Sequence, residues 1–228
     1  MATVLLVRHG RTTANATGLL AGRTPGVLLD EHGRAQAAEA ARRLVEVPIA
    51  GVVTSPLERC VQTAEALVAG RSDTPPVVID DRLNECDYGD WQNRPLEELA
   101  DEELWKVVQS EPSTVQFPGG ETMAAMQARA VAAIRAHDST HDAEAVWVAV
   151  SHGDVIKSIL ADALGMHLDS FQRISVHPAS VSIVHYGAHR PDVLAMNTEA
   201  GDLRWVADTS AGRATVGGGP GASSTTTT

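Results

Sequence analysis

Short apolar runs alternate with stretches of helical periodicity along the first 207 residues of the chain. Runs rich in valine, isoleucine and leucine that are bounded by turn-forming residues are typical of buried strands. Six runs predict strands, and a weaker seventh lies at residues 203–206. The six cover residues 3–7, 51–54, 77–79, 145–150, 181–185 and 193–197.

Helical patterns lie between most of these runs. Asp30 is placed to cap a helix that ends before Pro48, and Thr122 is placed to cap an alanine-rich helix that reaches about Ala136. Residues 57–69, 95–110 and 154–164 also have helical patterns. Strands that alternate with helices predict an α/β fold with three layers, α/β/α, around a mostly parallel central sheet.

The alternation has no break that would indicate a second domain. We therefore expect one domain over residues 1–208 of the 228-residue chain. Residues 209–228 are rich in glycine, serine and threonine, and the chain ends in four threonines. This composition lacks the apolar side chains needed for a core, so it predicts a disordered tail.

The charge balance limits the kinds of partner. A formal net charge of -11 argues against nucleic acid and against anionic membranes, because both need broad positive surfaces. A small anionic substrate is still compatible if cations gather in one cleft. Of the 18 basic residues 16 are arginines, which suit phosphate recognition, although GC-rich coding explains the same bias.

The N-terminal pattern, the length of the apolar runs and the two cysteines indicate the cellular compartment. The N-terminus enters a strand pattern directly, with no basic segment followed by an apolar one, and no apolar run is long enough to span a membrane. We therefore expect a cytoplasmic protein; spacing alone leaves a disulfide between Cys60 and Cys86 open, and a reducing compartment favours the free thiols. The sequence leaves a homodimer open.

Polar residues follow three of the predicted strands. Arg8-His9 ends the first, Ser55 follows the second, and Ser151-His152 follows the strand at residues 145–150. Ligands of open α/β sheets bind beyond the carboxyl ends of the strands, so these residues are expected to converge. A histidine beside a permanent guanidinium charge is suited to attack on a phosphoryl group, although such a pair is also compatible with a solvated sheet edge.

These residues belong to four separated motifs that resemble the histidine phosphatase superfamily, in the branch that includes the cofactor-dependent phosphoglycerate mutases. The likeness runs from residue 3 to about residue 165 and implies a phosphoglycerate mutase-like fold. The motifs are Leu6-Val7-Arg8-His9-Gly10-Arg11-Thr12 with Asn15, Ser55-Pro56-Leu57-Glu58-Arg59-Cys60-Val61-Gln62-Thr63, Leu83-Asn84-Glu85 with Gly89 and Trp91, and Ser151-His152-Gly153.

The resemblance implies roles for the residues at the strand ends. His9 would be the nucleophile, because a neutral imidazole offers a lone pair near pH 7. Arg8 and Arg59 would hold the phosphoryl oxygens, although ion pairing on a helix surface is the alternative for Arg59. His152 would donate to a transferring oxygen, and Gly153 would bring the positive end of a helix to the same anion.

A carboxyl group is needed to protonate the leaving oxygen and later to take a proton from water. Position alone does not separate Glu85 from four neighbours, and the resemblance to the family's Leu-x-Glu selects Glu85. The four neighbours are Asp80, Asp81, Asp87 and Asp90. The pKa of such an acid must be raised by burial or by nearby negative charge.

The phosphate cradle is expected to include Asn15 and the backbone amide of Gly22. The family commonly has a polar side chain before this glycine, and this chain has Ala21, so Arg23 or water is expected to replace the missing donor. Asn93 also departs from the family, which usually has glycine there. Glu121 is expected to be a supporting residue.

Two histidines four residues apart raise the question of a metal. His137 and His141 could bind one from a single helical face, but the sequence places no third ligand nearby. A solvated helix end is the simpler interpretation. We therefore expect neither a metal nor another cofactor.

Residues 86–121 are predicted to form a cap over the cleft. The mutases of the superfamily have a long basic insertion after the acid motif, whereas this segment has only Arg94 and Lys106 as cations. We therefore predict a phosphomonoesterase that hydrolyses a small phosphorylated metabolite through a phosphohistidine on His9. A phosphoglycerate-type phosphomutase and a non-catalytic phosphoester-binding module are the alternatives. Four cap residues either shape the pocket or belong to the core: Trp91, Leu99, Leu104 and Trp105.

Overall fold

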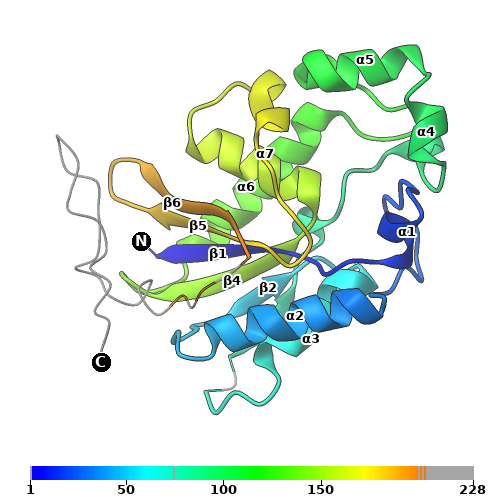
Figure 1. Cartoon of the computed structure of the whole chain (residues 1–228). Helices are drawn as coiled ribbons and strands as arrows, with labels where there is room; N and C mark the ends of the chain where they lie inside the picture. The colour runs from blue at the N-terminus through cyan, green and yellow to red at the C-terminus, as the bar shows by residue number, and fades with distance from the viewer. Residues whose placement is uncertain (1, 74, 200, 202, 204–228) are drawn as a thin grey trace.

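The computed structural model of the chain describes residues 2–73, 75–199, 201 and 203 (Figure 1). Its six described strands form one sheet in the order β3-β2-β4-β1-β5-β6. The strands are β1 (Thr3–Arg8), β2 (Val52–Thr54), β3 (Val77–Ile79), β4 (Val146–Ser151), β5 (Val181–Tyr186) and β6 (Pro191–Thr198). The six stronger strand predictions are confirmed.

The sheet is mixed, with most strands in one direction. The pairs β1–β4, β4–β2 and β2–β3 are parallel, whereas β5 is antiparallel to β1 and β6 is antiparallel to β5. Five of the six described strands therefore run the same way. The prediction of a mostly parallel sheet is confirmed.

Helices cover both faces of this sheet, as the three-layer prediction requires. The helices α2 (Glu31–Leu44) and α3 (Glu58–Val68) lie on one face, and α6 (Met123–Asp138) and α7 (Gly153–Ala163) lie on the other (Figure 1). The shorter described elements are α1 (Thr13–Ala16), α4 (Leu96–Leu99), α5 (Glu103–Ser110) and the 3-10 turns Asp81–Leu83, Gly89–Trp91, Pro112–Thr114 and Leu168–Arg173. None of the described helices is both long and apolar enough to cross a membrane.

Alternate side chains of β1 point to opposite faces of the sheet and join two different core clusters. Leu5 and Val7 of β1 join the cluster formed with α2 and α3, whereas Val4 and Leu6 join the cluster formed with α6 and α7. All four side chains are at most 1% exposed. A strand that is buried on both faces reads as a continuous apolar run, which is why the sequence pattern was clear here.

One predicted helix is divided into two in the structure. The segment 95–110 is not a single helix, because α4 ends at Leu99 and α5 begins at Glu103. Glu102 has an extended backbone, and its carboxylate accepts a 2.8 Å hydrogen bond from Arg94 Nη1. Leu99 is fully buried, so the chain turns where this apolar side chain enters the core.

The weak strand prediction at residues 203–206 is not borne out at Leu203. Leu203 is buried in the core cluster but lies outside any strand, and residues 204–206 lie outside the described part. The predicted tail at residues 209–228 also lies outside the described residues.

A close backbone contact joins the loop after β1 to α2. A Cβ atom added to Gly33 would lie 1.9 Å from the carbonyl oxygen of Arg11. We expect Gly33→Ala to lower the free energy of unfolding by about 3 kcal/mol, the upper end of ordinary overpacking effects. Urea unfolding measures this change. Gly51→Ala is the control, since its Cβ would meet its nearest atom at 3.5 Å; equal losses in the two variants would contradict the packing argument.

Candidate active site

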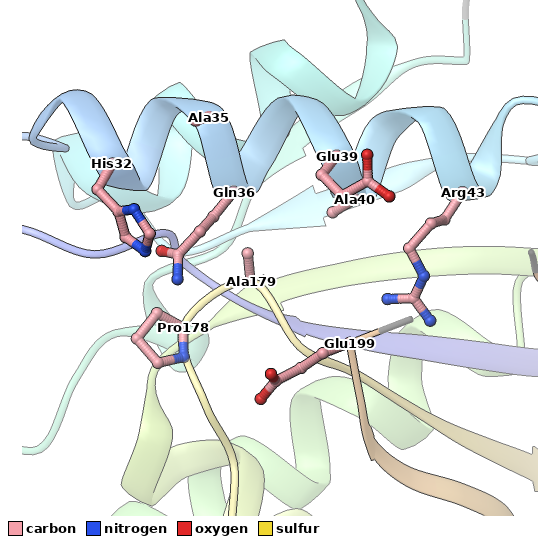
Figure 2. Close-up of a pocket in the computed structure, with 9 residues that line it drawn as sticks. All are labelled: His32, Ala35, Gln36, Glu39, Ala40, Arg43, Pro178, Ala179 and Glu199. Atoms are coloured by element: carbon pink, nitrogen blue, oxygen red, sulfur yellow. The ribbon is translucent and has the colours of Figure 1, made fainter. Parts of the chain in front are cut away.

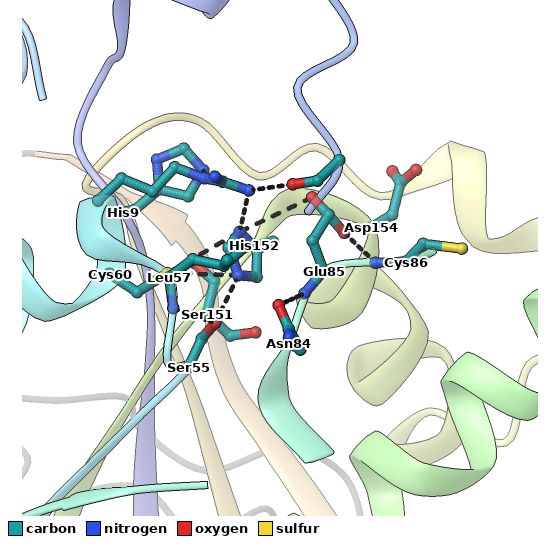
Figure 3. A network of polar contacts seen from close by, with 12 residues as sticks. His9, Ser55, Leu57, Cys60, Asn84, Glu85, Cys86, Ser151, His152 and Asp154 are labelled. Carbon is teal, nitrogen blue, oxygen red and sulfur yellow. Dashed lines mark hydrogen bonds and ion pairs between the residues drawn. The ribbon is translucent and has the colours of Figure 1, made fainter. Parts of the chain in front are cut away.

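The loops after β1, β2 and β4 meet at one edge of the sheet. His9, Ser55 and His152 come from these three loops and lie together, and Glu85 approaches His152 from the side of Asp154 (Figure 3). The strand register explains the meeting, because Arg8 of β1 pairs with Ser151 of β4, and Thr54 of β2 pairs with the preceding residue of β4. The predicted convergence at the carboxyl ends of the strands is thus present in the structure.

His9 is buried and oriented by the backbone of the next residue, Gly10. It is 3% exposed, and its Nδ1 lies 2.7 Å from the carbonyl oxygen of Gly10. A carbonyl only accepts, so Nδ1 carries the proton and Nε2 keeps its lone pair. Arg59 Nε, 3.3 Å away, donates to that Nε2 atom. Burial is the main cause that lowers the pKa of His9 well below its ordinary value, and the Arg59 guanidinium is the second. The ring is therefore neutral and nucleophilic at neutral pH.

Arg8 and Arg59 present unpaired donors beside this ring. Arg59 Nη2 donates to the carbonyl oxygen of Gly22 at 2.7 Å, and Arg8 Nη1 donates to the carbonyl oxygen of Val176 at 2.7 Å. Within the described part of the chain, Arg59 Nη1 and Arg8 Nε are buried and have no hydrogen-bond partner. Buried donors are rarely left unsatisfied, so these two groups indicate a place for an anion.

His152 is the N-cap residue of α7 and is fully buried. Its ring centroid lies 5.2 Å from that of His9, edge to face. Arg59 Nη2 donates to its Nδ1 at 3.2 Å, so the proton lies on Nε2, which donates to Ser55 Oγ at 2.8 Å. Burial, followed by the charge of Arg59, lowers the pKa of His152 well below its ordinary value. Arg59 therefore sets the tautomer of this histidine, and Ser55, predicted from the sequence only to follow a strand, accepts the hydrogen bond from its protonated Nε2.

Glu85 is the buried carboxyl group of the site. Its Oε1 accepts a hydrogen bond from the backbone amide of Cys86 at 2.9 Å, and its Oε2 lies 3.8 Å from His152 Nδ1 (Figure 3). Burial, and next the nearby Asp154 carboxylate, raise the pKa of Glu85 to about 7. The carboxyl group therefore holds a proton in a large fraction of molecules at neutral pH, as a general acid requires.

Arginine side chains hold the loop that carries Glu85. Arg129 Nη2 and Arg23 Nε each donate to the carbonyl oxygen of Glu85 at 2.9 Å, and both guanidinium groups pair with Glu121. Glu121 Oε1 also accepts from the backbone amide of Asp87 at 2.9 Å. Glu121 thus contacts the acid loop rather than the pocket.

The structure does not bring Arg23 into the phosphate cradle. Its guanidinium is held by Glu85 and Glu121, and its side chain does not line the pocket. The pocket side of this turn is instead formed by Ala21 and by Gly22, which has a φ of 52°. The carbonyl oxygen of Gly22 is the group that contacts the site, since it accepts from Arg59.

Asn15 and Gly153, which the sequence predicts to bind phosphate, both line the pocket. Asn15 Oδ1 accepts from the backbone amide of Thr12 at 3.1 Å, which fixes its amide group at the start of α1. Gly153 is the first residue of α7, and a Cβ atom there would meet the Arg8 guanidinium at 3.4 Å. The start of this helix therefore lies against the arginine that faces the anion site.

The pocket has a volume of about 190 Å³ and includes residues that the sequence analysis missed. They are Leu19, Leu20, Tyr88, Leu96, Asp154 and Lys157. Asp154 and Lys157 lie one and four positions after Gly153 on α7. Side chains three or four residues apart share one helix face, so this spacing was a signal in the sequence.

Other predicted candidates lie elsewhere. His137 Nε2 pairs with Asp80 Oδ2 at 2.8 Å, whereas His141 stacks on Trp147 with 5.5 Å between the ring centroids. The His137 ring also lies beside Trp147, with 6.0 Å between the ring centroids, so the two histidines share this neighbour. Trp91 and Leu99 of the expected cap belong to the buried core, and Leu104 and Trp105 pack against that core.

A second pocket lies between α2 and residues 178–179 and has a volume of about 330 Å³ (Figure 2). Arg43 lines it, and its guanidinium donates to the carbonyl oxygens of Thr198 and Gly201. None of the residues at the carboxyl edge of the sheet described above lines this pocket. Of these two pockets, only the smaller one is lined by Arg8, His9, Arg59 and Glu85.

Comparisons with known proteins agree with this geometry. The family model described as histidine phosphatase superfamily (branch 1) matches residues 4–199. The chain is 30% identical to "Phosphoserine phosphatase 1" of Hydrogenobacter thermophilus over 202 residues, which is 86% of this chain and 92% of that protein. It is 32% identical to "Probable phosphoglycerate mutase GpmB" of Cronobacter sakazakii over 189 residues, which is 82% of this chain and 86% of that protein.

A solved structure is also similar. The alpha-ribazole phosphatase from Shigella flexneri superposes with a TM-score of 0.77 at 28% sequence identity, and the match covers 88% of this chain and 98% of that one.

Proposed function

The chain belongs to the histidine phosphatase superfamily (branch 1), and we propose that it is a phosphomonoesterase acting on a small phosphorylated metabolite through a phosphohistidine on His9. One observation carries the proposal: the unprotonated Nε2 of a buried, neutral His9 accepts from Arg59 Nε at 3.3 Å, in a pocket also lined by Arg8 and Arg59, whose Nε and Nη1 atoms, respectively, have no partner among the described residues. Two of the similar proteins are phosphatases by name, a phosphoserine phosphatase and an alpha-ribazole phosphatase, which supports hydrolysis.

The first step transfers the phosphoryl group to His9. Nε2 attacks phosphorus, the bond between phosphorus and the ester oxygen breaks, and the proton of Glu85 moves to the leaving oxygen. The ring becomes a cation during this step, and the carbonyl oxygen of Gly10 stabilises it by accepting from Nδ1 at 2.7 Å. The free donors of Arg8 and Arg59 neutralise charge on the phosphoryl oxygens.

The second step restores the enzyme. The Glu85 carboxylate takes a proton from a water molecule, whose oxygen attacks phosphorus while the bond between nitrogen and phosphorus breaks. Inorganic phosphate leaves, and His9 and Glu85 return to their starting protonation states. A carboxyl group with a pKa near 7 serves both steps, because neither of its forms is strongly disfavoured at neutral pH.

Hydrolysis is favoured over transfer by the positions of the cap cations. A phosphomutase must hold its intermediate and shield the phosphoenzyme from water. Arg94 pairs with Glu102 and Lys106 pairs with Glu103, each at 2.8 Å, and neither cation lines the pocket. The cap segment therefore supplies no cation for the second end of a phosphoglycerate.

Two assays test this proposal. We expect the purified protein to hydrolyse p-nitrophenyl phosphate at an unchanged rate in excess chelator, since no step needs a metal. Phosphate transfer between 2- and 3-phosphoglycerate should be much slower than release of inorganic phosphate. Activity that disappears in chelator and returns with a divalent cation would contradict the metal-independent mechanism. Transfer that outpaces release would make the protein a mutase, and absence of both would support a binding module.

A further inference from the structure

One wall of the pocket has an ammonium group that the phosphoryl-transfer steps do not use. Lys157 lines the same pocket as His9, and the other basic side chains of this lining are Arg8 and Arg59. We propose that Lys157 determines specificity by binding a carboxylate on the leaving group, so that the substrate is a small phosphorylated carboxylic acid. This inference rests on the proposed phosphomonoesterase function.

Lys157 is held in place and has a donor to spare. Its Nζ lies 3.3 Å from Asp154 Oδ1 and 3.1 Å from Gln172 Oε1, and it lies 5.5 Å from the centroid of the Phe171 ring. An ammonium group has three N–H donors, so these two contacts leave one for a ligand. The side chain is only 19% exposed, so little conformational entropy is lost when it binds.

Asp154 holds Lys157 in place. Its negative charge also favours a carboxylate over a second phosphate as the ligand of Lys157. Its second carboxylate oxygen accepts from the hydroxyl group of Tyr88 at 2.9 Å, so both oxygens have partners. A second phosphate on the substrate would bring up to two negative charges towards Asp154 and Glu85, whereas a carboxylate brings one. A carboxylate is therefore the better match to this wall.

The apolar lining residues and the size of the pocket restrict the rest of the substrate. Leu19, Leu20 and Leu96 line the pocket and offer no hydrogen-bonding side chain. The volume of about 190 Å³ is below the range of about 300–1,000 Å³ that is typical of sites for drug-sized ligands. The pocket thus suits a leaving group of a few carbon atoms with its charge on the side of Lys157.

The chain provides a matched control for this lysine. Lys106 is the other of its two lysines. It also pairs with an acidic residue three positions earlier on a helix, Glu103, but its side chain is 70% exposed and lies outside the pocket. The two lysines therefore share a local ion pair and differ in access to the substrate.

A pair of substrates measures the contribution of the carboxylate to kcat/KM. O-phosphoserine and O-phosphoethanolamine differ only by this group. We expect the wild-type enzyme to prefer O-phosphoserine by about tenfold or more in kcat/KM, the factor that corresponds to 1.4 kcal/mol. In Lys157→Met the preference should fall to about twofold or less, mainly through a higher KM for O-phosphoserine, with Lys157→Arg retaining part of it. Lys106→Met should keep the full preference.

The outcomes separate this inference from the proposed function. Absence of a preference in the wild-type enzyme, or equal losses for the two substrates in Lys157→Met, would overturn the role of Lys157. If the wild-type protein hydrolyses neither substrate nor p-nitrophenyl phosphate, the proposed function fails, and calorimetry then tests the lysine alone. The role of Lys157 would be supported if the protein binds 3-phosphoglycerate more tightly than glycerol 3-phosphate and Lys157→Met loses this difference. Equal binding of the two ligands by the wild-type protein would overturn that role.

Discussion

Replacing His9 with alanine is expected to lower kcat by about 10⁴-fold or more, because the variant loses the nucleophile of a covalent mechanism. The remaining groups can bind and polarise a phosphoryl group, but the nitrogen proposed to receive it is gone. The measurement is steady-state hydrolysis of p-nitrophenyl phosphate, with circular dichroism to show that the variant is folded.

An exposed histidine outside the site controls for the substitution itself. His32 lies on α2 and lines the second pocket (Figure 2), and it does not line the pocket that contains His9. His32→Ala should retain the wild-type rate. A His9→Ala variant that is folded and still turns over at a comparable rate would show that the nucleophile lies elsewhere.

Replacing Glu85 with glutamine is expected to lower kcat by about 10²- to 10⁴-fold for alkyl phosphates, the range found for general acid–base catalysis. The leaving alkoxide needs the proton of Glu85, whereas p-nitrophenolate leaves readily without one, so the loss should be smaller for p-nitrophenyl phosphate. Because the acid must be protonated, kcat/KM of the wild-type enzyme should fall as the pH rises through about 7, the pKa that burial and Asp154 give to Glu85. This alkaline decline should be absent in the variant.

Asp90 supplies the control, since it was one of the four carboxyl groups that position alone could not separate from Glu85. It lies on the same loop, is exposed and does not line the pocket. Asp90→Asn should keep both the rate and the alkaline decline. If Asp90→Asn and not Glu85→Gln removed the decline, the acid would be wrongly assigned.

The layers of the fold were predictable because burial leaves a direct pattern in the sequence. The strand β1 is apolar at every core position since helices cover both of its faces, and Asp30 and Thr122 do cap α2 and α6. The break between α4 and α5 was not predictable from periodicity. It depends on the contact of Glu102 with Arg94 and on the burial of Leu99, which are tertiary effects.

The site was predictable where the backbone alone positions a residue. His9 and His152 directly follow parallel strands, so the order of elements brings them together. The destination of Arg23 was not predictable, because its partner Glu121 is 98 positions away and competes with the pocket for the guanidinium. The tautomer of His152 likewise depends on Arg59, which is 93 positions away.

The most direct test of the phosphohistidine mechanism is a rapid-quench experiment with radiolabelled p-nitrophenyl phosphate. The account predicts that label accumulates on the protein before steady state, that the bond is labile to acid and stable to alkali, and that peptide mapping locates it on His9. Turnover without any labelled protein on this timescale, or label on another residue with His9 unmodified, would contradict it.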